Sequence, residues 1–250
     1  TTYPIEYITN ELYGENSRVF SVYPNEIIDL SDKLLTDYSE GDLFVYNGLD
    51  KEKDYAVDML NKNKSLMIVD AAMGMEYTYD IEELWLNPSN FLMLCQNIKN
   101  GMKEYISNSY LRKEIDEKYD ELKLKISEMD ADIKLTAENA VDKNIIVSND
   151  VLLFLEKYKL NIVSLDKDTV TDKKISDAKD LINGKKINYI IMISGDEVTS
   201  EIEQMLEDNS IEKIYLHSLT TVSEEEENNN EDYITIMDKN IELLKKELYE

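Results

Sequence analysis

Cysteine, histidine and glycine are scarce in this chain of 250 residues, and each scarcity excludes a class of site. The single cysteine, Cys95, excludes an internal disulfide and a cysteine-rich zinc site. The single histidine, His217, leaves room for only one Ser-His-Asp triad, and no neighbouring motif supports one. With seven glycines, the chain has no glycine-rich phosphate loop, and it also lacks a Gly-x-Ser-x-Gly elbow and a His-Glu-x-x-His helix. We therefore expect a binding protein and not an enzyme.

The chain also has few basic residues relative to acidic ones, and it lacks long apolar runs. The chain has 27 basic and 53 acidic residues, which gives a formal net charge of −26. Such a polyanion repels nucleic-acid phosphates and anionic lipid head groups, so neither is an expected partner, and it resists self-association, so we expect a monomer. No apolar run reaches the roughly 18 to 20 residues that a membrane-spanning helix needs.

Short apolar runs alternate with helical patterns along both halves of the chain. This alternation is typical of βα units with parallel strands. The expected helices lie at 28–38, 53–60, 151–158, 174–182, 198–206 and 233–248. The expected strands are Val19–Tyr23, Leu43–Tyr46, Leu66–Val69, Ile145–Val147, Ile162–Leu165, Tyr189–Ile193 and Ile214–Leu216.

Between the halves, residues 108–139 contain no glycine or proline and are dense in Glu, Lys and Leu. Apolar residues recur there at spacings of three and four, from Leu111 to Ile133, which predicts one long amphipathic helix. The predicted fold is α/β, with two lobes that are each an open, mostly parallel sheet flanked by helices, joined by one long connecting helix. The predicted divisions are residues 1–107 for the N-terminal lobe, 108–140 for the connecting helix and 141–250 for the C-terminal lobe.

The acidic run Ser223–Asn230 is expected, from its composition, to be a solvated loop. Elsewhere, polar residues directly follow several of the predicted strands. Ligands of open α/β sheets bind beyond the carboxyl ends of the strands. Candidates there are Glu26, Asn149 and His217, and Glu83 adds a carboxylate two residues before the only tryptophan. These groups are expected to converge in a cleft between the lobes.

Six segments resemble the cluster A-I metal-binding lipoproteins, the zinc and manganese solute-binding proteins of ABC importers. The resemblance runs in order along nearly the whole chain. It includes the strand Gly41–Gly48 and Glu83-Leu84-Trp85-Leu86-Asn87-Pro88, which stands where the family has His-x-Trp-Leu-(Asp/Ser)-Pro. The other matching segments are Thr1–Pro4, Asn90–Met102, Ile146–Val151 and Asp232–Met237. The resemblance implies a two-lobed extracellular protein that delivers a divalent ion to ABC permease subunits, attached to the cell membrane of a Gram-positive bacterium by a lipid anchor that this sequence does not contain.

The resemblance also places the four metal-binding positions of the family on residues of this chain. They fall at Glu26, Glu83, Asn149 and His217, and none of the four is the residue that the family usually has there. Two hypotheses follow. In the first, three oxygen donors and one imidazole hold Mn²⁺ or Zn²⁺, with an oxygen-rich set favouring Mn²⁺ or another hard ion. In the second, the cleft binds no metal, and the protein is a surface interaction protein or binds another small ligand.

Overall fold

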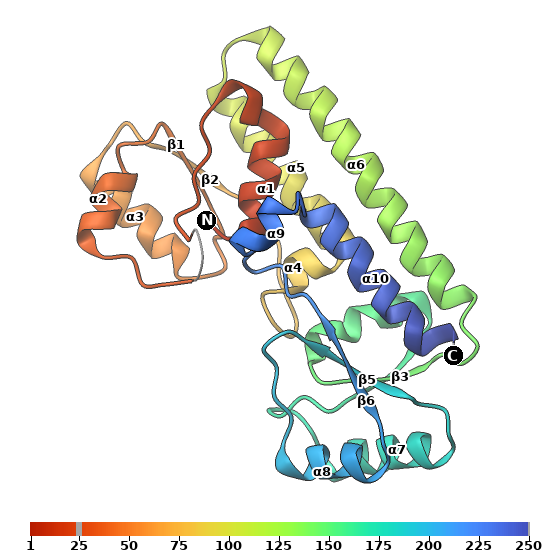
Figure 1. Ribbon diagram of the computed structural model, residues 1–250. Coiled ribbons are helices and arrows are strands. Elements are labelled where there is room, and N and C mark those ends of the chain that lie inside the picture. The colour runs from red at the N-terminus through yellow and green to blue at the C-terminus, as the bar shows by residue number, and fades with distance from the viewer. Residues whose placement is uncertain (24–26, 250) are drawn as a thin grey trace. The chain divides into compact units, whose positions relative to one another are not determined.

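The computed structural model describes residues 1–23 and 27–249 and divides them into two compact units (Figure 1). Unit 1 contains residues 1–77, 84–127 and 219–233, and unit 2 contains residues 78–83, 128–218 and 234–250, with residue 250 itself outside the described set. The chain therefore passes between the units several times. The lobe boundaries expected from the sequence, 1–107, 108–140 and 141–250, stay a prediction.

Unit 1 is built on two parallel strands, β1 (Leu43–Tyr46) and β2 (Met67–Asp70). The helices α2 (Asp32–Tyr38) and α3 (Glu52–Lys62) pack together beside the sheet, and their apolar side chains form one core with those of β1. Helix α5 (Pro88–Tyr105) packs on β2 at Gly101, where an added Cβ would lie 2.5 Å from a Val69 methyl. A glycine is required there because the helix backbone approaches the strand so closely.

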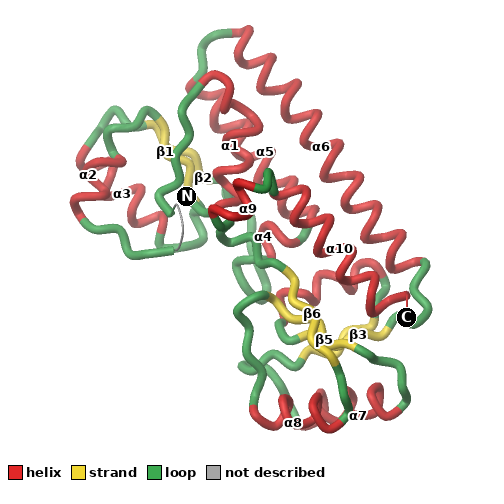
Figure 2. The backbone as a smooth tube through the Cα atoms, viewed as in Figure 1, coloured by secondary structure: helices red, strands yellow, loops and turns green. Residues whose placement is uncertain are grey.

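Unit 2 contains a four-stranded parallel sheet in the order β4-β3-β5-β6. The strands are β3 (Asn144–Val147), β4 (Asn161–Ser164), β5 (Tyr189–Ile193) and β6 (Glu212–Leu216). Helices α7 (Asp172–Asn183) and α8 (Ser200–Asp208) lie along one side of the sheet, as Figure 2 shows. Their buried residues, Ala178, Ile182, Ile202 and Met205, pack against Ile190 and Met192 of β5 in one continuous core.

The long helix predicted from spacing is present as α6 (Ser109–Glu138). Its apolar stripe is buried at seven positions: Ile115, Tyr119, Leu122, Ile126, Met129, Ile133 and Ala137. Residues up to Ser127 belong to unit 1 and those from Glu128 to unit 2, so one unbroken helix contributes core residues to both. The last helix, α10 (Tyr233–Tyr249), does the same, because only Tyr233 belongs to unit 1.

Most predicted elements are confirmed to within a few residues, but two predictions are wrong. Val19–Tyr23 forms no strand, and the sheet of unit 1 has no third strand among the described residues. The acidic run contains a short helix, α9 (Glu224–Asn228), where a loop was expected. Ser223 and Glu226 form a reciprocal capping box at its start, and the acidic first turn complements the helix dipole. The region 151–158 is helical as predicted, but it is a 3₁₀ helix, η2 (Asp150–Tyr158).

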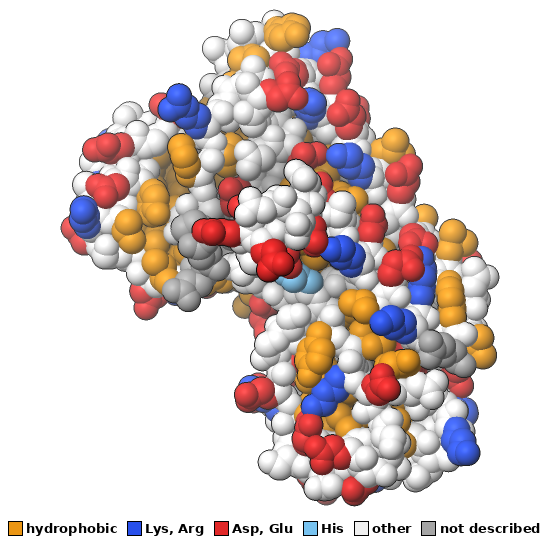
Figure 3. All heavy atoms as spheres, in the orientation of Figure 1, with side chains coloured by type: hydrophobic (Ala, Val, Ile, Leu, Met, Phe, Trp, Pro, Cys, Tyr) orange, Lys and Arg blue, Asp and Glu red, His pale blue; other side chains and the backbone are white. Residues whose placement is uncertain are grey.

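Within residues 1–23 and 27–249, no helix is both long enough and apolar enough to cross a membrane. Figure 3 shows acidic and basic side chains interspersed over the face that it draws, with acidic ones in many places.

The side chain of Tyr233 contacts three helices of unit 1. It is fully buried, its ring stacks on Phe91 of α5 at a centroid distance of 3.7 Å, and it lies 5.6 Å from the ring of Tyr7 in α1 (Tyr3–Tyr13). Its hydroxyl donates a hydrogen bond of 2.5 Å to the carbonyl oxygen of Trp85 in α4 (Glu83–Leu86). One side chain therefore contacts three helices and satisfies a buried carbonyl of the third.

Replacing Tyr233 by phenylalanine should destabilise unit 1 by about 1–3 kcal/mol, because the Trp85 carbonyl would lose its buried donor while the ring packing is kept. Urea unfolding monitored by tryptophan fluorescence would measure the change, since Trp85 is the only tryptophan. The matched control is Tyr110→Phe, because the Tyr110 side chain is 72% exposed. Equal stability of the two variants would show that the hydroxyl of Tyr233 contributes nothing.

Candidate functional site

The strand order of unit 2 creates a topological switch point between β3 and β5. From β3 the chain moves to β4 on one side, and it then crosses to β5 and β6 on the other. Loops that leave neighbouring strands in opposite directions open a crevice at the carboxyl edge, which is where doubly wound α/β proteins bind ligands. The residues that follow β3, β5 and β6 are therefore the candidates for a site within this unit.

Side chains that follow β3 and β5 meet at this edge. Asp196, after β5, accepts a hydrogen bond of 2.7 Å from the Ser148 hydroxyl and one of 3.3 Å from the side-chain amide of Asn149, both after β3. The same carboxylate accepts a 3.2 Å bond from the backbone N–H of Ile193. A carboxylate thus links the two loops across the switch point.

Asn149 is also the N-cap of η2. Its Oδ1 accepts a hydrogen bond of 2.8 Å from the backbone N–H of Val151, which would otherwise lack an intrahelical partner. Its Nδ2 is directed to Asp196. The amide therefore has one remaining lone pair on Oδ1 with which to bind a cation.

His217 follows β6 on the same edge. Its backbone is held by the buried Asn240 of α10, whose Oδ1 accepts from the His217 N–H at 2.8 Å and whose Nδ2 donates to the His217 carbonyl at 3.0 Å. Leu216, just before it, pairs in register with Ile193 of β5. Since β5 lies between β3 and β6, the backbones at Asn149 and His217 are two strand spacings apart, about 10 Å.

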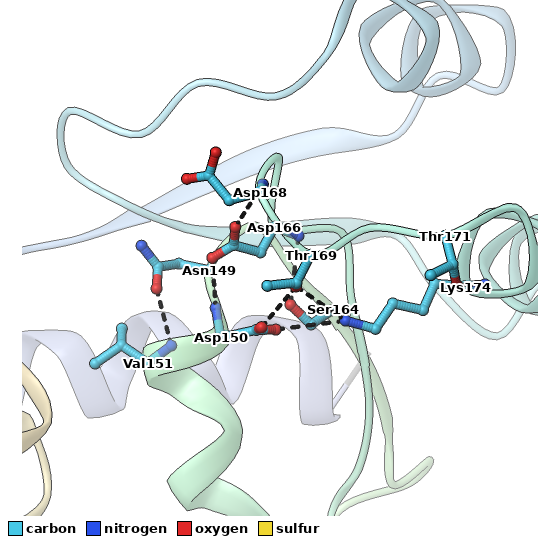
Figure 4. Close-up of polar contacts among 9 residues, drawn as sticks. All are labelled: Asn149, Asp150, Val151, Ser164, Asp166, Asp168, Thr169, Thr171 and Lys174. Atoms are coloured by element: carbon cyan, nitrogen blue, oxygen red, sulfur yellow. Dashed lines mark hydrogen bonds and ion pairs between the residues drawn. The ribbon is translucent and has the colours of Figure 1, made fainter. Parts of the chain in front are cut away.

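A second polar cluster fixes the loop after β3 to the loop after β4 (Figure 4). The backbone N–H of Asp150 donates to Asp166 at 3.0 Å, and the Thr169 hydroxyl donates to the Asp150 carboxylate at 2.6 Å. Lys174 of α7 lies 3.6 Å from the same carboxylate and donates to the Thr169 hydroxyl at 3.2 Å. These contacts determine the position of Asn149, which directly precedes Asp150.

The environment of Asp150 stabilises its charged form. Burial alone would raise the pKa of this carboxyl, but the hydroxyls of Ser164 and Thr169 and the ammonium of Lys174 outweigh burial and lower the pKa. Asp150 is 8% exposed, so its partners are little screened by water.

Glu83 and Glu26 are the remaining predicted ligands. Glu83 begins α4, and its Oε2 accepts a hydrogen bond of 2.9 Å from the backbone N–H of Thr78. It belongs to unit 2, as Asn149 and His217 do. Glu26 lies outside the described residues.

Asp196 is the site residue that the sequence analysis missed. Its position directly after the strand Tyr189–Ile193 was the available signal, because that strand borders the switch point once the strand order is known. No group of three or more His, Cys, Asp or Glu side chains in residues 1–23 and 27–249 is arranged to hold a metal ion. Among the four predicted ligands, Asn149 is not one of these residue types and Glu26 lies outside the described residues. The predicted set of ligands therefore stays a prediction.

Asp150→Asn should lower the free energy of unfolding by about 1–2 kcal/mol at neutral pH, because it removes the charge that Lys174 and Thr169 stabilise. The folded-state pKa of Asp150 lies below that of the unfolded chain, which is about 3.9. The contribution is therefore complete above pH 4 or so and is lost as the pH falls through the folded-state pKa. Urea unfolding of both proteins from about pH 7 down to about pH 3 should show the gap close. A gap that is constant with pH would exclude a charge effect.

Three solved structures illustrate the similarity of the whole chain to known folds. The metal-dependent lipoprotein YcdH from Bacillus subtilis is 18% identical, with a TM-score of 0.78 over 99% of this chain and 97% of that one. The Zn(II)-bound ZnuA-like domain of AdcA from Streptococcus pneumoniae is 17% identical, with a TM-score of 0.75 over 100% and 97%. The laminin-binding protein Lbp of Streptococcus pyogenes is 15% identical, with a TM-score of 0.75 over 99% and 96%. These matches confirm the predicted α/β fold class.

No curated protein sequence matches the chain. A family model does: ZnuA, described as the periplasmic component A of the zinc-uptake complex, matches residues 1–247. This match confirms the resemblance inferred from the sequence motifs and the expectation that the protein is not an enzyme. The chain belongs to the ZnuA family of metal-binding solute-binding proteins of ABC importers.

Proposed function

We propose that this protein captures a divalent cation outside the cell and delivers it to the permease subunits of an ABC importer. The match of the ZnuA family model to residues 1–247 carries this proposal. The local geometry supports it, since polar side chains after β3 and β5 meet at the edge where this type of sheet binds ligands, and His217 follows β6 at the same edge.

The proposed ligands are Glu26, Glu83, Asn149 and His217, and Asp196 stands beside Asn149 as a further carboxylate. This set has one nitrogen donor, and its other donors are oxygens. Oxygen-rich sets suit Mn²⁺ better than the softer Zn²⁺, so we propose Mn²⁺ as the preferred ion and Zn²⁺ as the second. Carboxylates also balance the charge of a dication.

Attachment to the membrane through a lipid anchor, as in the related lipoprotein YcdH, is part of the same proposal, as is a monomeric state. The anchor would keep the protein near the permease. The acidic surface would be repelled by anionic lipids and so would not bind the membrane itself.

A second candidate is a surface interaction protein without a metal. One observation favours it: both ends of the Asn149 side chain already have protein partners, Val151 and Asp196, at the position where the family has a metal ligand. One of the similar structures, Lbp, is a laminin-binding protein. An acidic surface of this kind would bind a basic partner by charge complementarity.

Titration calorimetry with MnCl₂ and ZnCl₂ on chelator-treated protein tests the cation proposal. We expect one site with Mn²⁺, and His217→Ala and Glu83→Ala should each weaken it at least about tenfold, a change of about 1.4 kcal/mol. Glu212→Ala is the matched control, because Glu212 is exposed at the other end of β6. Absence of heat with both ions, or equal loss in the control, would leave the surface interaction protein as the function.

Acidic pH should weaken the same site, because a protonated imidazole cannot bind a metal. Affinity for Mn²⁺ at about pH 5 should be well below that at about pH 8 in the natural protein. In His217→Ala the remaining dependence should be smaller. Identical pH profiles for the two proteins would remove His217 from the ligand set.

A further inference from the structure

A second hollow lies within unit 1, at the amino ends of β1 and β2. Its volume is about 800 Å³, and its walls come from α1, the segment after it, the loop that enters β1 and the end of α5. Neither Glu83, Asn149 nor His217 lines it. Small-molecule sites have volumes of about 300–1,000 Å³, so the hollow is large enough for an organic ligand.

The walls of the hollow are apolar and aromatic. Phe44 and Met102 are buried beneath it, and Tyr13, Tyr38 and Tyr105 place phenol rings around it. Phe20 also lines it and is 77% exposed. An apolar surface open to water at the mouth of a hollow favours a ligand with an apolar body.

The charges around the hollow are mainly negative. Four carboxylates line it, those of Glu6, Asp37, Glu40 and Asp42, against two cationic groups, Arg18 and the amino-terminal ammonium of Thr1. Asp37, Glu40 and Asp42 are exposed and have no ion-pair partner in the described part of the chain. Burial raises the pKa of Glu6 even though the nearby amino terminus acts in the opposite direction, so a further cation next to Glu6 would stabilise its charged form.

We propose that this hollow binds a small organic cation with an apolar body, such as a quaternary ammonium compound. The carboxylates attract its charge, and the aromatic rings contact both its apolar part and the face of its cationic group. An anion is disfavoured because four carboxylates line the hollow against two cationic groups. A bare metal ion is disfavoured because the walls offer it more apolar carbon than convergent oxygen. The hollow lies at the amino ends of β1 and β2 in unit 1, whereas Asn149 and His217 of the proposed metal site follow β3 and β6 of unit 2.

Binding of benzyltrimethylammonium, measured by ligand-detected NMR and calorimetry on the whole protein, tests the proposal. Benzyl alcohol and benzenesulfonate are the neutral and anionic comparison probes. We expect the cation to bind more tightly than either. Glu40→Gln combined with Asp42→Asn should weaken the cation at least about threefold, and Phe20→Ala should weaken it about twofold to fivefold.

Matched controls make the test independent of folding and of the metal site. Asp58→Asn removes an exposed carboxylate of α3, and Tyr110→Ala removes an exposed ring of α6; neither lines the hollow, so both should bind the cation as the natural protein does. Chelator treatment and His217→Ala should also leave this binding unchanged. Equal binding of the three probes, no binding at about 10 mM, or equal weakening in the controls would overturn the proposal.

Discussion

Backbone N–H groups at the ends of the parallel strands need acceptors, and in this chain side-chain carboxylates supply them. Asp70 accepts from Gly48 and Ala72 at the carboxyl edge of unit 1. In unit 2, Asp196 accepts from Ile193, and Asp166 accepts from Asp150 and Asp168. At the opposite edge the buried Glu247 accepts from Asn188 and Tyr189 at the start of β5. Bonds from backbone N–H to carboxylate are stronger than those between neutral groups, so part of the negative charge of this protein holds its loops in place.

This structural use of carboxylates affects what the carboxyl edge of unit 2 can bind. Asp196 already accepts three hydrogen bonds, and both ends of the Asn149 amide are engaged. A cation that binds there has only the second lone pair of Asn149 Oδ1 or must compete with donors already in place, whereas a histidine at that position would offer its ring nitrogen directly. The site proposed for this chain should therefore bind more weakly than a histidine-rich one, and its preference should follow the oxygen donors.

The spacing of apolar residues correctly predicted those helices and strands whose apolar side chains pack into a core along one helix face or along a continuous strand. The strand Tyr189–Ile193 and the long helix from Leu111 to Ile133 are in this class, because the period of their pattern is set by the core they face. The sequence did not reveal Asp196 as a neighbour of Asn149, since that contact depends on β5 lying next to β3, and strand order is a property of the whole sheet. Helix α9 was missed for a different reason: net charge suggested a loop, although the Ser-x-x-Glu capping box was present in the sequence.

The wrong prediction of a strand at Val19–Tyr23 and the hollow in unit 1 have the same structural origin. An apolar run predicts a strand only if a neighbouring strand edge accepts its backbone, and β1 pairs with β2 alone among the described strands. Because the segment does not pair, its side chains are not forced to alternate between two faces of a sheet. Val22 and Tyr23 turn into the core, whereas Phe20 stays in water. Val19, Phe20 and Val22 line the hollow together with Leu43 and Val45 of β1, so an apolar run that forms no strand supplies part of the apolar lining.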